Sequence, residues 1–319
     1  MIKDKRILIT GGGGFIGSAL AKRLSPHNDV TVLDLSFNFS QSIDNDIDAI
    51  VADIRNLDEI AELVRCNQII IHTAARLGVQ NVIDSIKGTL DTNYTGTANM
   101  LQAVSESSCC ERFVYFSTSE VFGDNSTKIT EDSTSIFPSI GNSRWCYGVG
   151  KLAAEYLVLG YHQSCGLPTT IIRPFNVFGA GRTGDYAILR FIRQALSGED
   201  IVIHGDGLQV RAWCYIDDFC DAIISSLSTK EAIGESFNIG NPKNTTDIFQ
   251  LAYTVKSLCQ SKSNIVCEPT PYIDISSRVP NIEHARNILE FNPSVSLVEG
   301  LKRTIEWVMD NDGKANKAN

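Results

Sequence analysis

The sequence predicts an α/β fold in which a parallel sheet carries helices on both faces, and three observations lead to this prediction. Short apolar runs alternate with helical patterns through residues 1–175. The first apolar run ends in a glycine-rich turn that leads directly into a helix. Beyond residue 175 the alternation loosens, which indicates a smaller mixed lobe. Regular alternation of strand and helix is typical of a doubly wound parallel sheet.

The glycine-rich turn is the strongest local signal. Residues 6–10 form a short apolar strand, the turn follows, and residues 15–24 have helical periodicity. In the turn, Gly11 can adopt the tight bend, Gly14 lets a pyrophosphate approach the main chain, and Gly17 lets the helix pack against the strand. Free N–H groups at the helix start, at Phe15 and Ile16, would then point at the phosphates. The pattern predicts a Rossmann-like, dinucleotide-binding start to the chain; the alternative is a chance glycine-rich loop.

An acidic residue follows the second strand. Residues 30–33 are apolar and end at Asp34, in the position where a carboxylate accepts hydrogen bonds from the adenosine ribose. No Arg or Lys lies between Val30 and Asp53, so a 2′-phosphate would find no cation, and we expect NAD rather than NADP. Asp53 and Ile54 match an adenine-edge contact. Asp53 could equally cap the helix expected at residues 56–64.

The remaining elements follow in order. We expect strands at residues 69–73, 112–117, 169–174, 201–203 and 236–239, and helices at residues 93–105, 147–161, 187–196, 217–227, 246–259 and 297–309. This order predicts a dinucleotide-binding domain of residues 1–175, to which residues 212–240 return, and a substrate lobe of residues 176–211 and 241–319. Gly11, Asp34, His72, Ser117 and Phe175 all fall at carboxyl ends of strands, where open parallel sheets bind ligands, so we expect them to line one crevice.

Composition excludes several classes of function. The net charge is −9 and the pI is about 5.1, which argues against nucleic acid and anionic membranes as partners. No run approaches about 18 apolar residues, and the first strand begins too early for a signal peptide, so we expect a cytoplasmic protein. The nine cysteines contain no Cys-x-x-Cys pair, and the five histidines lack the spacing of metal ligands. We therefore expect reduced thiols and no metal.

Ordered motifs along the whole chain resemble one family, the extended short-chain dehydrogenase/reductases that modify nucleotide-diphosphate sugars. The matching segments are Thr10 to Gly17, His72 to Ala75, Asn93 with Gly96 and Thr97, Ser117 to Gly123, Tyr147 with Lys151, Arg173 to Gly179, Gly205 to Gly207 with Arg211, and Arg278 before Pro280. The chain is similar to UDP-sugar epimerases, dehydratases and decarboxylases over essentially its whole length. These motifs identify the family much more firmly than they identify one reaction, because one fold hosts many reactions.

The resemblance implies a catalytic role for Tyr147. It would remove the proton from the sugar hydroxyl at carbon 4 while the hydride goes to NAD, which gives a 4-keto sugar. A tyrosine pKa of about 10 is too high for this task, so Lys151, one helical turn on, is expected to lower it together with the positive nicotinamide. Thr118 would hydrogen-bond the reacting oxygen. The alternative is that Tyr147 and Lys151 form an exposed pair. The cofactor contacts implied by the resemblance are Phe15, Ile16, Ala74, Asn93, Ser117, Tyr147 and Lys151.

Glu120 bears on which reaction follows. Dehydratases and glucuronate decarboxylases that resemble this chain carry Glu in a Thr-x-Glu arrangement, whereas simple 4-epimerases often have a small or neutral residue there. The dTDP-glucose dehydratases place an Asp before that Glu, and here Ser119 stands instead. The favoured outcome is therefore decarboxylation or dehydration of a UDP-sugar. A UDP-hexose or UDP-hexuronate 4-epimerase is the close alternative, and a non-catalytic NAD-binding protein is a remote one. Glu120 could also be a structural acid.

Four further residues are candidates for substrate binding. Arg278 could hold a uronate carboxylate or the diphosphate, whereas Arg211 and Asn176 are expected to grip the diphosphate, and Arg182 could do the same. Each arginine could instead form an ordinary ion pair. Relatives of this type dimerise through the helix that carries the catalytic tyrosine, so we expect a homodimer.

Two departures from the family pattern remain. Gly150 stands where Ser or Ala usually precedes the lysine, and Phe122 replaces a common Tyr.

Overall fold

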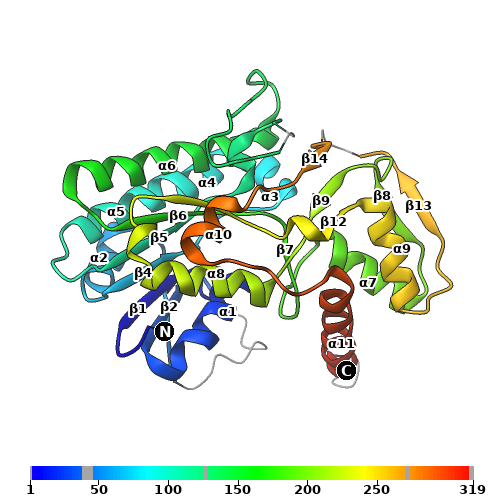
Figure 1. The fold of residues 1–319 in the computed structure, drawn as a ribbon, viewed down its shortest axis with the longest axis horizontal. Coiled ribbons are helices and arrows are strands. Elements are labelled where there is room, and N and C mark those ends of the chain that lie inside the picture. Colours follow the sequence, from blue (N-terminus) through cyan, green and yellow to red (C-terminus); the bar gives the residue numbers. More distant parts are fainter. Residues whose placement is uncertain (1, 38–45, 126–127, 271–273, 316–319) are drawn as a thin grey trace.

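A seven-stranded, fully parallel sheet is built from strands between residues 6 and 174 and one later strand at residues 236–239 (Figure 1). The structure is a computed structural model that describes residues 2–37, 46–125, 128–270 and 274–315. The strand order in this sheet is β11-β6-β5-β4-β1-β2-β3, and each neighbouring pair is parallel. The predicted doubly wound sheet is therefore confirmed. The strand order reverses at β1, so the crevice between the carboxyl ends of β1 and β4 is where such folds bind ligands.

The elements of the described residues have the following bounds. The strands are β1 Arg6–Thr10, β2 Asp29–Asp34, β3 Ile47–Val51, β4 Ile69–His72, β5 Arg112–Phe116, β6 Thr169–Pro174, β7 Val177–Phe178, β8 Ile201–His204, β9 Val210–Ala212, β10 Cys214–Tyr215, β11 Ser236–Ile239, β12 Thr245–Asp247, β13 Ile265–Glu268 and β14 Ser277–Arg278. The α-helices are α1 Phe15–Leu24, α2 Leu57–Arg65, α3 Val79–Asp84, α4 Ile86–Leu90, α5 Gly96–Ser105, α6 Cys146–Cys165, α7 Ala187–Ser197, α8 Ile216–Ser228, α9 Ile248–Leu258, α10 Glu283–Leu289 and α11 Leu297–Ala315. Short 3-10 helices at Ser119–Phe122 and Ser143–Trp145 matter for the site.

Both faces of the large sheet are buried, which explains why its strands are almost continuously apolar. Ile7 and Ile9 of β1 face an apolar cluster that contains Leu20 of α1 and Phe219 of α8. Leu8, between them, faces a second cluster that includes residues of α2, α5 and α6. Because successive side chains of a strand point to opposite faces of the sheet, the apolar residues of β1 pack against helices on both faces.

The C-terminal lobe has small sheets and helices of its own (Figure 1, right). Strand β8 pairs with β13, and β9 pairs with both β12 and β14. Segment 236–239 joins the large sheet as β11, beside β6. One apolar cluster runs from Ile7 of the sheet through Phe191 of α7 to Leu251 of α9 and Leu301 of α11. The division of the chain into two domains stays a prediction.

Several helices differ from their predicted bounds. A single π-helical turn, Asp91–Thr95, precedes α5, so the helix predicted at residues 93–105 begins as a wider turn. Helix α6 runs on to Cys165, where Gly166 ends it in a left-handed conformation with φ +67°. Helix α11 continues to Ala315 rather than ending at residue 309. None of the helices described is long and apolar enough to cross a membrane.

Candidate functional site

The turn between β1 and α1 is shaped by glycines at close approach. Gly11 has φ +72°, and its N–H donates to the Leu33 carbonyl at 2.7 Å. A Cβ on Gly17 would lie 2.3 Å from the Gly11 oxygen, and a Cβ on Gly12 would lie 2.3 Å from Val32 Cβ. Gly12, which the sequence analysis did not single out, is therefore also required. Gly14 precedes α1 without a side-chain cap, so the first N–H groups of the helix, from Phe15 onward, remain available to a phosphate.

Replacing Gly17 with alanine is expected to weaken NAD binding about 10- to 100-fold, because overpacking costs about 1–3 kcal/mol and the contacted atom is a main-chain oxygen that can move only with the turn. Fluorescence titration with NAD measures this change. Gly160→Ala is the matched control: it lies on exposed α6 surface with no atom within 4 Å of its Cβ position, and should bind NAD normally. Unchanged affinity in Gly17→Ala would contradict the assignment of this turn.

Asp34 lies at the end of β2, beside the turn. Its Oδ2 accepts a hydrogen bond from the Gly13 N–H at 3.0 Å, and Oδ1 accepts one from Leu35 N–H at 2.8 Å. Because the side chain is only half-buried, its carboxylate still has lone pairs for ribose hydroxyls. Asp34 thus lies where the sequence analysis expected it.

Asp53 and Ile54 follow β3. The carboxylate of Asp53 pairs with Arg55, with Nη2 at 2.5 Å from Oδ2, and this hydrogen bond lowers the pKa of Asp53. The helix-cap alternative for Asp53 is wrong: Asn56 caps α2, its side chain accepting from Asp58 N–H. Ile54 is buried against Gly96 at the start of α5. The adenine contact stays a prediction.

His72 and Phe175 are fully buried, so the expectation that they line the crevice is wrong; His72 ends β4, and Ala74 and Asn93 follow it in the chain. His72 is buried between the Thr10 and Thr97 hydroxyls at 2.7 and 3.0 Å, and burial lowers its pKa to about 3, so it is a neutral structural residue. Ala74 N–H donates to Thr10 Oγ1 at 3.3 Å. The Asn93 amide accepts a hydrogen bond from the Arg76 N–H and donates one to the Arg76 carbonyl, both at 2.9 Å. Asn93 therefore positions the loop after β4.

The start of α6 is pressed against the segment that follows β5. A Cβ on Gly148 would lie 2.5 Å from the Glu120 carbonyl oxygen, so this glycine brings Tyr147 close to Thr118 and Glu120. Lys151 is 1% exposed, and its Nζ donates to the Phe116 carbonyl at 2.7 Å. The exposed-pair alternative for Tyr147 and Lys151 is therefore wrong.

Gly150 and Phe122, the two departures from the family pattern, both lie in packed surroundings. A Cβ on Gly150 would lie 3.0 Å from Leu90 Cδ2 of α4. The Phe122 ring is buried, with the Arg173 guanidinium 5.1 Å from its centroid. Arg173 forms a bidentate buried ion pair with Glu155, at 2.9 and 2.7 Å, and so fastens α6 to β6.

The electrostatics of the tyrosine–lysine pair differ from the expectation. Burial raises the pKa of Tyr147, a hydrogen bond with Thr118 lowers it, and nearby Glu120 raises it further. Burial lowers the pKa of Lys151 to about 7, against the opposing effect of Glu155. The expected lowering of the Tyr147 pKa by Lys151 is not found in the protein alone, because desolvation of the phenolate dominates.

Glu120 faces a group of buried arginines from three distant segments. We call Arg144, Arg211, Arg278, Glu120 and Asp274 the arginine cluster. Arg144 Nη1 lies 3.6 Å from Glu120 Oε2, and Nη2 lies 3.4 Å from Asp274 Oδ1, which Arg211 Nη2 approaches to 3.0 Å. Strand pairing places Arg278 beside Arg211. Burial lowers the pKa of Arg278 to about 10, while Glu120 opposes this shift.

Two members of the arginine cluster, Arg144 and Asp274, escaped the sequence analysis. Neither belongs to a motif used there, although Arg144 lies only three residues before Tyr147. Arg278 was predicted, and its Nη1 and Nη2 donate to the main-chain carbonyls of Asn125 and Gly123 at 3.1 and 2.5 Å. It therefore also anchors the segment that follows Glu120.

Arg182 lies apart from the arginine cluster. Its guanidinium is 3.5 Å from the Tyr186 ring centroid and 5.0 Å from that of Phe15, at the start of α1, and Nη1 donates to the Val177 carbonyl at 3.3 Å. It thus faces the glycine-rich turn. Asn176 has φ +24°, and its buried Nδ2 has no hydrogen-bond partner. The buried Ser117 hydroxyl likewise has none. Such unpaired groups indicate a ligand or water at this end of the sheet.

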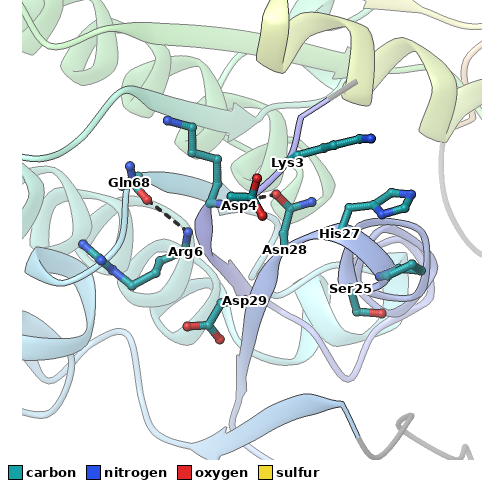
Figure 2. Close-up of a pocket in the computed structure, with 10 residues that line it drawn as sticks. Lys3, Asp4, Arg6, Ser25, His27, Asn28, Asp29 and Gln68 are labelled. Atoms are coloured by element: carbon teal, nitrogen blue, oxygen red, sulfur yellow. Dashed lines mark hydrogen bonds between the residues drawn. The ribbon is translucent and has the colours of Figure 1, made fainter.

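An open depression of about 580 Å³ lies at the opposite end of the sheet (Figure 2). Its lining comes from the amino ends of β1 and β2, and includes Lys3, Asp4, Arg6, His27 and Asp29. Parallel sheets bind ligands at their carboxyl ends, so we assign it no part in the site.

Comparison with known proteins identifies the family. Residues 7–240 match the model of the NAD dependent epimerase/dehydratase family. The chain belongs to this family. It is 35% identical to a UDP-N-acetyl-alpha-D-glucosaminuronate decarboxylase of Bacillus cytotoxicus over 95% of this chain and 97% of that protein. It is 30% identical to a UDP-glucuronate 4-epimerase of Thermodesulfobacterium geofontis, over 95% of this chain and 96% of that protein.

Solved structures agree with this assignment. A UDP-glucuronic acid 4-epimerase from Bacillus cereus, crystallised with UDP-glucuronic acid and NAD, superposes with a TM-score of 0.87 and 28% identity, covering 96% of this chain and 99% of that one. As a member of the NAD dependent epimerase/dehydratase family, the chain is an enzyme with NAD as its cofactor. The Rossmann-like fold and the cofactor predicted from the glycine-rich turn are confirmed.

Proposed function

We propose that the protein decarboxylates a UDP-linked hexuronic acid through a 4-keto sugar. The observation that carries this proposal is the position of Glu120, which is a neighbour both of Tyr147 and of the cluster residues Arg144 and Arg278. An acid beside the tyrosine that deprotonates the C4 hydroxyl can move a proton next to the new ketone, and cations beyond it can hold an anionic substituent of the sugar. Similarity to the decarboxylase of Bacillus cytotoxicus supports the same reaction.

The residues present fit NAD. The turn around Gly11 and Gly17 has no room for a side chain, Asp34 offers a carboxylate to a ribose, and the Ser117 hydroxyl is unpaired. Gly14, Phe15 and Ile16 would present main-chain N–H groups to the pyrophosphate. When bound, NAD supplies a hydride acceptor and a positively charged ring. That charge opposes the effect of burial on the Tyr147 pKa.

The side chains then act in sequence. Tyr147 takes the proton from the C4 hydroxyl, while Thr118 hydrogen-bonds the same oxygen. The resulting 4-ketone is β to the C6 carboxylate, so the C5–C6 bond can break as carbon dioxide leaves and its electron pair moves into a C4 enolate. Tyr147, now protonated, stabilises the enolate oxygen. Glu120, protonated from solvent, would deliver a proton to C5, and Tyr147 would return its proton to O4 when C4 is reduced again.

For the diphosphate, we propose Arg211 and Asn176 as ligands. The Arg211 guanidinium already donates to a carboxylate, that of Asp274, at 3.0 Å. Asn176 has a buried amide nitrogen without a hydrogen-bond partner. Arg278 lies near Glu120, so we expect it at the sugar end of the substrate. Arg182 packs on Phe15 at the start of α1, and we therefore expect it to act on the cofactor side of the site.

A UDP-hexuronate 4-epimerase is the second candidate, because relatives of that activity cover nearly the whole chain. Mass spectrometry after incubation with NAD and UDP-glucuronate, UDP-N-acetylglucosaminuronate, UDP-glucose or UDP-N-acetylglucosamine decides between the outcomes. Loss of carbon dioxide from a uronate is the expected result. An unchanged mass with a new stereoisomer on chromatography would make the protein an epimerase, and loss of water would make it a dehydratase.

We also propose a homodimer formed through α6. Val149, Leu152, Tyr156 and Leu159 recur on one side of this helix, and Tyr156 and Leu159 are 70% and 38% exposed. Leu90 of α4, beside it, is 37% exposed. Tyr156→Glu/Leu159→Glu is expected to convert the dimer to a monomer in light scattering. Leu208→Glu, on an exposed turn, is the control that should stay dimeric. A monomeric wild-type protein would contradict the proposal.

A cytoplasmic location is part of the same proposal. All nine cysteines are free, and their burial ranges from exposed to buried, as expected in a reducing compartment. Fractionation of cells that express the tagged protein tests the location.

A further inference from the structure

Arg144 has a buried guanidinium whose donors are largely unused. Its side chain is 6% exposed, yet Nε and Nη1 have no hydrogen-bond partner. Its two ion pairs, to Glu120 and Asp274, are long at 3.6 and 3.4 Å. Trp145 covers one face of the guanidinium, 4.8 Å from the ring centroid. Buried charged donors are normally paired, so this arginine is prepared for an acceptor that the protein does not supply.

The other two cluster arginines are better satisfied. Arg278 gives Nη1 and Nη2 to main-chain carbonyls, and only its Nε is unpaired. Arg211 gives Nη1 to the Val210 carbonyl and Nη2 to Asp274. Arg144 therefore keeps more unpaired donors than either neighbour.

The charge of the arginine cluster indicates the kind of acceptor. Three arginines face two carboxylates, Glu120 and Asp274, which leaves an excess of one positive charge. Asp124, also near Arg278, is exposed to solvent. A buried excess of positive charge attracts an anion, and a planar carboxylate matches the forked donors that Arg144 leaves unpaired.

The position of Arg144 relative to Tyr147 indicates which part of the substrate Arg144 would bind. Arg144 immediately precedes the helix that carries Tyr147, and Glu120 neighbours both residues. A sugar whose C4 hydroxyl meets Tyr147 has its C6 carbon two bonds further on. We propose that Arg144 is a specificity residue that binds the C6 carboxylate, so that the site selects uronates over neutral sugars. This inference rests on the proposed function at the same site.

The test is calorimetric binding of UDP-glucuronate and UDP-glucose to the NAD-loaded protein, in a Tyr147→Phe background that prevents turnover. We expect the parent to prefer UDP-glucuronate, and Arg144→Gln to weaken UDP-glucuronate about 10- to 100-fold while UDP-glucose binding changes little, because one charge-assisted contact is lost. Arg211→Gln is the matched comparison: it should weaken both ligands equally, through their common diphosphate.

Three results would overturn the inference: a parent without preference for the uronate, equal loss of both ligands in Arg144→Gln, or no loss of either. Arg144→Lys keeps the charge and most of the stem, and should retain part of the preference, so it serves if Arg144→Gln does not fold. Failure of the proposed function is distinguishable, because uronate preference without release of carbon dioxide leaves the binding role of Arg144 intact.

Discussion

Replacing Tyr147 with phenylalanine is expected to lower turnover about 10²- to 10⁴-fold, the range that general acid–base groups contribute. The ring would still fill its place beside Thr118, so NAD and UDP-sugar binding should change little. What is lost is the hydroxyl that accepts the C4 proton. In the structure this hydroxyl lies in a desolvated setting that raises its pKa, with a hydrogen bond from Thr118 acting in the opposite direction.

A steady-state assay on the preferred UDP-sugar, together with titrations of NAD and UDP, separates these effects. Tyr253→Phe is the matched control, because it makes the same chemical change on a helix, α9, at a residue that is 56% exposed and belongs neither to the site nor to the proposed dimer face. Its turnover should equal that of the wild type. A Tyr147→Phe protein with full biological activity would instead revive the reading of the chain as a non-catalytic NAD-binding protein.

Local sequence signals predict the parts of the fold that depend on local physics. The strand at residues 6–10 and the helix at residues 15–24 have the predicted bounds, because an apolar run, a glycine turn and a helical period each act over a few residues. Strands β7, β9, β10, β12 and β14 are two or three residues long and were not predicted. So short a strand carries no period of its own, and its pairing depends on distant partners.

The candidate site shows the same limit. Tyr147, Lys151, Thr118 and Glu120 were found from motifs, and the structure brings them together. Arg144 and Asp274 meet across 130 residues of sequence, so only the folded chain reveals their contact. The predicted lowering of the Tyr147 pKa combined Lys151 with the positive nicotinamide, and without the cofactor burial raises this pKa. Motif spacing contains no information on desolvation.

Replacing Glu120 with glutamine is expected to separate the two halves of the proposed reaction. Oxidation at C4 depends on Tyr147 and NAD and should continue, whereas proton delivery to C5 should slow about 10²- to 10⁴-fold. Absorbance of the reduced nicotinamide should then rise and persist, and mass spectrometry should detect a keto sugar in place of the final product.

The control for Glu120→Gln is Asp124→Asn, which also removes a carboxylate near Arg278 but at an exposed position. It should turn over normally. If Glu120→Gln still forms the final product at the wild-type rate, Glu120 transfers no proton, and an epimerase becomes the better reading because returning a hydride to the opposite face of the ketone needs no second acid. Accumulation of the reduced cofactor in Glu120→Gln alone would instead assign the carboxylate to the step after oxidation. The cluster arginines near Glu120 would then be expected to hold the C6 carboxylate that leaves as carbon dioxide.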